Sequence, residues 1–194
     1  MTITKTPIDD LLIIEPKVFQ DDRGYFMESF KSSLIEQYLP EIHFIQDNES
    51  KSTYGVLRGI HFQKPPFAQT KLVRVIEGEV LDIAVDLRKK SPTYGKHYSI
   101  LLSGDNKKQF LIPKGFGHGF AVLSESAIFS YKVDNEYHPE CDSGIRYDDK
   151  DLGIDWNLKH SDVVLSNKDS QLQNFKNFTQ RFWTKLFRPH IVCS

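Results

Sequence analysis

Short runs in which hydrophobic and polar residues alternate fill the middle of the chain. In residues 79–88, EVLDIAVDLR, leucine, isoleucine and valine recur at every second position, with Asp82 and Asp86 on the other face. This period of two predicts a β-strand with one buried face. Residues 71–80, KLVRVIEGEV, come just before and contain Glu77-Gly78, a pair that predicts a hairpin turn.

Four further strand-like runs follow at residues 98–103, 108–113, 119–123 and 127–133, separated by the turn-rich segments SGDN, PKGFG and SES. Short strands at this spacing, with few helical stretches between them, favour an antiparallel sandwich or barrel. The expected fold class is therefore mainly β, with a few short peripheral helices.

Two segments have helical spacing instead. Residues 32–40, SSLIEQYLP, place apolar side chains at helical intervals and end at a proline. Residues 173–187, QNFKNFTQRFWTKLF, carry an apolar stripe made of Phe175, Phe178, Phe182, Trp183 and Leu186. We expect this stripe to pack on the barrel or on a second subunit; the alternative is a basic amphipathic helix at a membrane surface.

Composition narrows the functional classes. The 194 residues suffice for one domain, expected to span residues 1–194 with 175–194 as a helical C-terminal extension. A formal charge of −1 and a pI near 6.7 argue against nucleic-acid binding. No apolar run approaches the ~20 residues of a membrane span, and MTITKTPIDD does not resemble a signal peptide. We therefore expect no membrane insertion and a cytoplasmic location.

Cys141 and Cys193 allow one disulfide, but a reducing cytosol favours two free thiols.

Two histidine segments resemble the cupin superfamily of small β-barrels. GVLRGIHFQ, residues 55–63, fits the cupin pattern G-x5-H-x-H except that Gln63 replaces the second histidine, and PKGFGH, residues 113–118, fits P-x-G-x-x-H. Two histidines from separate strands, without a neighbouring carboxylate, are too few ligands for a closed transition-metal site. We therefore expect a barrel without metal, in which His61 is either a proton carrier or a satisfied core histidine.

The resemblance extends to a narrower family. Six segments resemble, in order, the dTDP-4-dehydrorhamnose 3,5-epimerase family over about residues 5–170: DDRGYFMESF (21–30), QDNESKSTYGVLRGIHFQ (46–63), QTKLVRVIEGEVLDIAVDLR (69–88), SPTYGK (91–96), IPKGFGHGFAVLSE (112–125) and GIRYDDKDLGIDW (144–156). This resemblance implies a cupin jelly-roll homodimer without metal or dissociable cofactor. It also implies inversion of C3 and C5 of a dTDP-linked 4-keto-6-deoxy sugar, in L-rhamnose or related deoxysugar biosynthesis.

Inverting a carbon beside a ketone requires a base on one face, a donor to the enolate oxygen and an acid on the other face. The resemblance implies that His61 is the base, Asp169 its orienting carboxylate and Tyr131 the acid, with Lys71 at the 4-keto oxygen. Tyr131 also falls on the inward face of its predicted strand. Taken alone, Asp169 fits a capping or solvated aspartate equally well, Tyr131 a core tyrosine and Lys71 a solvated edge residue.

The resemblance also implies the substrate contacts. The arginines are expected at the diphosphate, and the segment holding Arg23 is expected to cross into the site of a neighbouring subunit. The implied substrate-binding residues are Arg23, Phe26, Glu28, Gln46, Asp47, Asn48, Arg58, Gln63, His118, Tyr137, Asp142 and Lys168.

One feature of the GVLRGIHFQ segment conflicts with a shared site. Arg58 and His61 are three positions apart, so a regular strand would point them to opposite faces. Gly59 lies between them and is suited to a bulge that re-aims one side chain.

Three alternatives remain open at this level. Single-carbon epimerases acting on a related nucleotide-linked 4-keto sugar share most of these residues. A non-catalytic sugar-nucleotide-binding cupin would not need an opposed acid and base. A metal-dependent cupin oxygenase would need bound iron or zinc.

Overall fold

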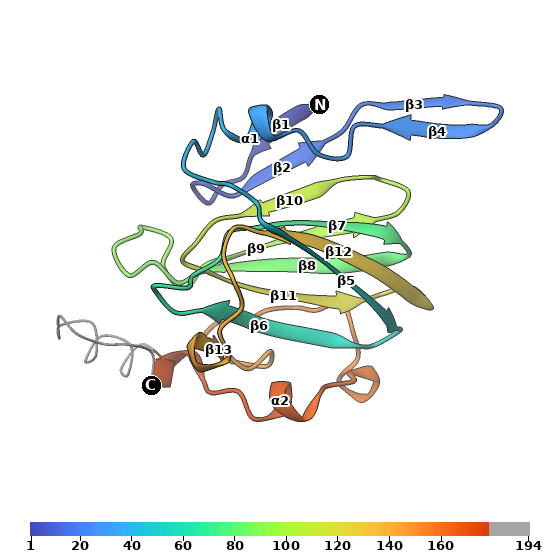
Figure 1. Cartoon of the computed structure of the whole chain (residues 1–194). Coiled ribbons are helices and arrows are strands. Elements are labelled where there is room, and N and C mark those ends of the chain that lie inside the picture. Colours follow the sequence, from blue (N-terminus) through green and yellow to red (C-terminus); the bar gives the residue numbers. More distant parts are fainter. Residues whose placement is uncertain (179–194) are drawn as a thin grey trace.

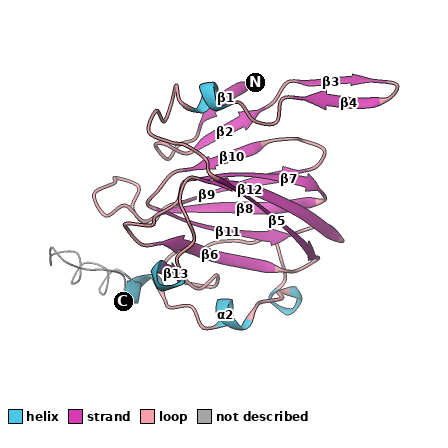
Figure 2. Ribbon diagram, in the orientation of Figure 1, coloured by secondary structure: helices cyan, strands magenta, loops and turns pink. Residues whose placement is uncertain are grey.

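The computed structural model describes residues 1–178, and most of its regular structure is β-strand (Figures 1 and 2). One antiparallel sheet has the order β1 (Thr2–Lys5), β2 (Leu12–Glu15), β10 (Gln109–Ile112), β7 (Lys71–Glu77), β12 (Ser126–Val133) and β5 (Gln46–Thr53). The second has the order β13 (Asp142–Gly144), β6 (Leu57–Gln63), β11 (Phe116–Val122), β8 (Glu79–Asp86) and β9 (His97–Ser103). The predicted mainly β, cupin-type jelly roll with short peripheral helices is confirmed.

The main core fills the space between the two sheets. Every second residue of the facing strands points inward, and Val73 and Phe129 of the first sheet meet Val80 and Phe120 of the second. The rings of Phe120 and Phe129 stack with their centroids 4.2 Å apart. This packing fixes the two sheets relative to each other, and the cavity described below lies beside it.

Strand β8 is buried on both faces, so the prediction of one buried face is wrong. Its outward residues Leu81, Ile83 and Val85 pack under the C-terminal segment, which contributes Ile145 and Trp156. The alternating pattern predicts a half-solvated strand because two aspartates interrupt the other face. Both aspartates are instead buried and bonded to polar partners.

The predicted hairpin at Glu77-Gly78 is also wrong. Strand β7 pairs with β10 and β12, whereas β8 pairs with β11 and β9, so the chain changes sheets at this point. Gly78 has φ +80°, and a Cβ there would lie 2.0 Å from the carbonyl oxygen of Ser126. The glycine therefore permits a tight crossing between sheets, a role that local sequence cannot distinguish from a hairpin turn.

Two short strands, β3 (Val18–Asp21) and β4 (Gly24–Met27), form a hairpin that projects from the body of the molecule (Figure 1). Its aromatic side chains are exposed, with Phe26 67% and Tyr25 55% accessible. Such a row of accessible aromatic residues on a two-stranded hairpin is typical of a surface that contacts another chain.

Helices are few and short. The helix predicted at residues 32–40 is reduced to one turn, α1 (Ser32–Ile35), whose Ile35 packs on the outer face of the first sheet. Helix α2 (Asn167–Ser170) and the 3-10 turns Pro139–Cys141 and His160–Asp162 lie near the second sheet. The four other predicted strands are confirmed to within three residues at either end.

The C-terminal stripe is described in part. Residues 175–178 are helical, and Phe175 and Phe178 pack against the second sheet, as predicted for packing on the barrel. The positions Phe182, Trp183 and Leu186 lie outside the described residues.

Cys141 is buried and disulfide-bonded, so the expectation of a free thiol there is wrong. Cys193 lies outside the described residues. No helix within residues 1–178 is long and apolar enough to cross a bilayer.

Candidate active site

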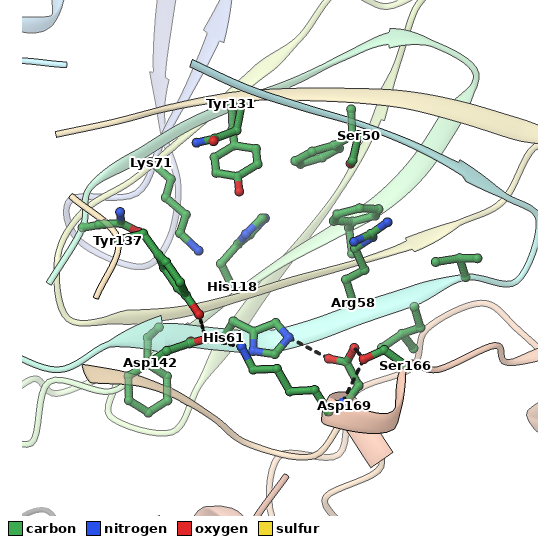
Figure 3. A pocket seen from close by; sticks show the side chains of 18 of the residues that line it. Ser50, Arg58, His61, Lys71, His118, Tyr131, Tyr137, Asp142, Ser166 and Asp169 are labelled. Atoms are coloured by element: carbon green, nitrogen blue, oxygen red, sulfur yellow. Dashed lines mark hydrogen bonds and ion pairs between the residues drawn. The ribbon is translucent and has the colours of Figure 1, made fainter. Parts of the chain in front are cut away.

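A cavity of about 670 Å³ opens between the two sheets (Figure 3). Its walls come from β5, β12 and β7 on one side, β6 and β11 on the other, and the loop that leads into α2. The sequence-predicted residues that line it are Asn48, Arg58, His61, Gln63, Lys71, His118, Tyr131, Tyr137, Asp142, Lys168 and Asp169.

Five predicted residues do not line this cavity. Gln46 and Asp47 begin β5, where Gln46 donates to Asn48 Oδ1 at 2.7 Å and Asp47 pairs with Lys132. The remaining three belong to the projecting hairpin and the loop after it, and all are exposed: Arg23, Phe26 and Glu28. Arg23 instead pairs with Asp21 at 2.6 Å. One chain therefore does not bring the hairpin residues to its own cavity.

His61 and Asp169 form a short polar contact in the cavity wall. The Nε2–H of His61 donates to Oδ1 of Asp169 at 2.6 Å, so the other ring nitrogen, Nδ1, keeps its lone pair. No hydrogen-bond donor among residues 1–178 engages that Nδ1. The sequence separates the two residues by more than a hundred positions, and the fold joins them by placing α2 beneath β6 (Figure 1).

Asp169 is held as a carboxylate by several donors. Although burial alone would raise its pKa, hydrogen bonds from His61, the Ser166 hydroxyl and the Gly59 amide lower the pKa to about 2. Ser166 is also the N-cap of α2, and its oxygen accepts from the Asp169 amide. The charge and the orientation of Asp169 are therefore fixed at neutral pH.

Tyr131 and Lys71 enter the cavity from the sheet opposite His61 (Figure 3). Tyr131 pairs with Val73 in the β12–β7 ladder, and Lys71 begins the same strand β7, so both side chains point inward. Burial raises the pKa of the Tyr131 hydroxyl. Burial also lowers the pKa of Lys71 to about 8, against the opposing attraction of Asp142 and Asp82. A phenol and an imidazole thus face each other across the cavity, and an ammonium enters it from the same sheet as the phenol.

The predicted bulge at Gly59 exists. Arg58 and His61 are three positions apart, yet their partners on β11, Phe120 and His118, are two apart. The extra residue lets both side chains line one cavity. Gly59 has φ +115°, and a Cβ there would lie 2.6 Å from the Cα of Gly119, so no larger residue fits without a backbone shift.

His118 belongs to a second histidine–carboxylate pair. Its Nε2 lies 2.9 Å from Oδ2 of the fully buried Asp82. Burial lowers the pKa of His118, with Asp82 acting in the opposite direction. A neutral imidazole therefore lies next to His61, its partner in the β11–β6 ladder.

The outer end of the cavity is polar. Asp142 on β13 accepts hydrogen bonds from the Tyr137 hydroxyl at 2.9 Å and from the Lys168 ammonium. Gln63 occupies the position of the second cupin histidine, and its side-chain amide forms hydrogen bonds with backbone groups. Its Nε2 donates to the carbonyls of Phe67 and Glu136, and its Oε1 accepts from the His138 amide.

The histidine ligands of a cupin metal site are otherwise engaged here, because each bonds a carboxylate of its own. Within residues 1–178, no cluster of three or more His, Cys, Asp or Glu side chains has the arrangement of a metal site. A metal-free barrel remains a prediction, supported by this chemistry of the side chains.

Three functional neighbours escaped the sequence reasoning: Ser166, Asp82 and Ser52, which accepts from Arg58 at 3.1 Å. Ser166 had a readable signal, because Ser166-x-x-Asp169 has the spacing of a capping box. Asp82 had a weaker one, an aspartate inside an apolar run. Nothing local distinguishes Ser52.

The family model described as dTDP-4-dehydrorhamnose 3,5-epimerase matches residues 5–177. The chain belongs to this family. A dTDP-4-dehydrorhamnose 3,5-epimerase from Methanothermobacter thermautotrophicus is 53% identical over 166 residues, which cover 85% of this chain and 89% of the relative. The family resemblance drawn from the ordered motifs is thus confirmed.

Solved structures of the family agree. The dTDP-4-dehydrorhamnose 3,5-epimerase from Elizabethkingia anophelis is 52% identical, with a TM-score of 0.87 over 91% of this chain and 97% of that one. The dTDP-6-deoxy-D-glucose-3,5-epimerase from Legionella pneumophila, solved with dTDP-4-keto-L-rhamnose, is 50% identical, with a TM-score of 0.85 over 89% and 92%.

A more distant structure is described as a 3′-monoepimerase. This Streptomyces bikiniensis protein, solved with dTDP-quinovose, is 27% identical, with a TM-score of 0.83 over 90% of this chain and 88% of that one. The barrel alone therefore does not distinguish a one-carbon from a two-carbon epimerase.

Proposed function

We propose that this epimerase inverts C3 and C5 of dTDP-4-dehydro-6-deoxy-D-glucose to give dTDP-4-dehydro-L-rhamnose, with His61 as the base and Tyr131 as the acid. One observation carries the assignment of roles. The His61–Asp169 pair and the Tyr131 hydroxyl enter one cavity from opposite sheets. The reaction itself is supported by membership of the family and by 53% sequence identity to a relative named for this reaction.

The first step is removal of a proton from a carbon next to the C4 ketone. The imidazole of His61, oriented by its hydrogen bond to Asp169, accepts that proton. The C–H electron pair becomes the enolate double bond, and the former carbonyl pair moves to the oxygen at C4. Asp169 stabilises the imidazolium that forms, because its low pKa keeps the carboxylate charged.

Lys71 is positioned for the developing oxyanion. Its ammonium extends into the cavity between the base and the acid (Figure 3) and makes no hydrogen bond or ion pair with another residue of the described chain. A free ammonium in a partly buried site stabilises an enolate more strongly than one exposed to water.

Tyr131 completes the inversion from the other face. Its hydroxyl proton passes to the enolate carbon, and the resulting phenolate and the imidazolium of His61 then exchange protons with solvent. Because burial raises the pKa of Tyr131, the hydroxyl stays protonated until the enolate is formed. Repeating the cycle on the other side of the ketone inverts the second carbon.

The polar end of the cavity suits the nucleotide. Lys168 offers a cation for the diphosphate at this end, and the exposed Tyr137 ring offers a face for the base. Arg58 offers a second cation toward the other end of β6 (Figure 3). Asp142, which bonds both Tyr137 and Lys168, fixes their positions. Asn48 at the rim of the cavity supplies an amide for polar groups of the ligand.

We further propose a homodimer in which the projecting hairpin completes the partner's site. Arg23, Phe26 and Glu28 are exposed and lie outside the cavity of their own chain. A contact between two copies would bury the hairpin aromatics and would bring Arg23 to a second diphosphate.

Hydrogen exchange tests the proposal. The epimerase is incubated in D₂O with dTDP-4-dehydro-6-deoxy-D-glucose, and the sugar is followed by NMR. We expect deuterium at both C3 and C5, together with the L-rhamno product. Exchange confined to one carbon would instead establish the single-carbon alternative.

His61→Asn addresses the non-catalytic alternative. The variant should bind dTDP with nearly unchanged affinity, because the nucleotide end of the cavity is intact, and should lose exchange at both carbons. If His61→Asn retained full exchange, His61 would not be the base.

A further inference from the structure

Lys71 places a partly buried amine in the cavity. Its side chain extends into the space between the sheets (Figure 3) and makes no hydrogen bond or ion pair with another of residues 1–178. Burial lowers the pKa of Lys71 to about 8, against the attraction of Asp142 and Asp82. At pH 7.5 roughly a quarter of this side chain is therefore free amine, against about a thousandth for a lysine of ordinary pKa. A free amine in such a site is a nucleophile toward carbonyl carbons.

Groups that can move the protons of an amine–aldehyde condensation line the same cavity. The nitrogen lone pair bonds to the carbonyl carbon, the carbonyl pair moves to oxygen, and a proton passes from nitrogen to that oxygen. An acid then supplies a second proton, the oxygen leaves as water, the nitrogen pair closes the C=N bond, and the remaining nitrogen proton returns to a base. The Tyr131 hydroxyl and the His61 imidazole are positioned as donor and acceptor for these transfers. The condensation consumes no oxidant or reductant.

A cation without a carboxylate partner lies in the wall that carries His61. Arg58 donates to the Ser52 hydroxyl at 3.1 Å and forms no ion pair within residues 1–178. The bulge at Gly59 directs its guanidinium to the cavity. A guanidinium matches the oxygens of a phosphate group in charge and geometry. Arg58 therefore favours an aldehyde that also carries a phosphate.

The apolar part of the cavity suits a flat ring between these two groups. Phe120 and Phe129 line it, with their ring centroids 4.2 Å apart. The volume of about 670 Å³ lies within the range of pockets that hold drug-sized ligands. Apolar walls also limit the access of water, and water is the reagent that hydrolyses an imine.

We propose that this cavity is also a covalent binding site for phosphorylated aldehydes, in which Lys71 forms an imine with the aldehyde carbon and Arg58 binds the phosphate. An aldehyde held in this way occupies the site of the sugar and inhibits the enzyme. The proposal does not depend on the epimerisation described above, since the imine forms without a sugar nucleotide.

Pyridoxal 5′-phosphate is the probe, because borohydride reduction converts its imines into stable secondary amines. The full-length protein is incubated at pH 7.5 with an equimolar amount of the probe, reduced, digested and mapped by mass spectrometry. We expect the label on Lys71 to exceed that on any other lysine by roughly tenfold or more. Peptide mapping separates this label from label on the N-terminal amine. Label spread evenly over the lysines would overturn the proposal.

Matched reagents and variants test the two contacts. Lys71→Arg should lose the cavity label, whereas Lys150→Arg, a change at an exposed position, should retain it. Pyridoxal, which lacks the phosphate, should label Lys71 of the unmodified protein roughly tenfold less than its phosphate does. In Arg58→Gln the two reagents should label Lys71 equally. Equal labelling by both reagents in the unmodified protein, or an advantage of the phosphate that persists in Arg58→Gln, would overturn the assignment of the phosphate to Arg58.

Discussion

At the scale of single residues, burial and hydrogen bonding set the charges of the site. Three donors hold Asp169 ionised, burial keeps the Tyr131 hydroxyl protonated, and burial brings the pKa of Lys71 down to about 8. The residue types at these positions were readable from the family motifs. The shifts were not, because they depend on neighbours from distant parts of the chain.

Lys71 predicts an alkaline limit to activity. Above its pKa of about 8 the ammonium loses its proton and no longer stabilises the enolate, so kcat/KM should fall as pH rises through about 8, approaching tenfold per pH unit. Asp169, with a pKa of about 2, should contribute no limb above pH 5. A pH–rate profile measures both expectations.

Lys71→Arg is the control, because a guanidinium stays charged throughout this range. Its activity should be lower at pH 7 but should lack the limb near pH 8. If the limb persisted in Lys71→Arg, another group would be responsible for it.

Asp169→Asn should lower kcat by roughly 10²–10⁴-fold, because an amide neither stabilises the imidazolium nor fixes the His61 tautomer. Asp151→Asn, a change at an exposed position, should leave kcat unchanged. Steady-state kinetics together with dTDP binding separate this loss from a loss of affinity. A decrease below tenfold would show that Asp169 mainly caps α2.

At the scale of elements, the bulge in β6 joins the two halves of the site. Arg58 and His61 share a cavity because Gly59 adds one residue to the strand. The sequence indicated both the conflict and the glycine that relieves it. The hairpin predicted at Gly78 is wrong, because a glycine with positive φ is equally suited to a hairpin turn and to a crossing between sheets.

Gly59→Ala should therefore lower the free energy of unfolding by more than about 1 kcal/mol and reduce kcat/KM by roughly tenfold or more, because the new Cβ meets the Gly119 backbone. Gly24→Ala provides the matched control for stability. Gly24 has φ +129°, but a Cβ there would meet nothing within 4 Å. Chemical denaturation of both variants separates backbone strain from the clash, and equal destabilisation would refute the steric argument.

At the scale of the whole molecule, the two sheets bring Tyr131 and His61 to one cavity, and the projecting hairpin carries its predicted ligand contacts away from it. A proposed dimer reconciles the two observations. In such a dimer, each site contains residues of both chains. The proposal can therefore be tested by mixing variants, without reference to any single side-chain distance.

Mixing inactive variants provides that test. In a dimer of His61→Asn with Arg23→Ala, one site combines both defects and the other has neither. Equal amounts of the two variants, after subunit exchange, should recover roughly a quarter of the unmodified activity. Activity assays before and after exchange measure the recovery. No recovery, although exchange is verified by mass, would place Arg23 in its own chain's site, and full activity of Arg23→Ala alone would place it outside any site.

The sequence by itself determined the central strands, the family and half of the residues that line the cavity. A period of two fixes which side chains share a face, and ordered motifs identify chemistry without coordinates. It could not determine which polar side chains pair across the cavity and the core. His61 and Asp169, His118 and Asp82, and Arg58 and Ser52 meet because the sheets close on each other and α2 packs beneath β6. The burial of both faces of β8 was likewise decided by tertiary structure, since the C-terminal segment covers the face that an isolated sheet would leave in water.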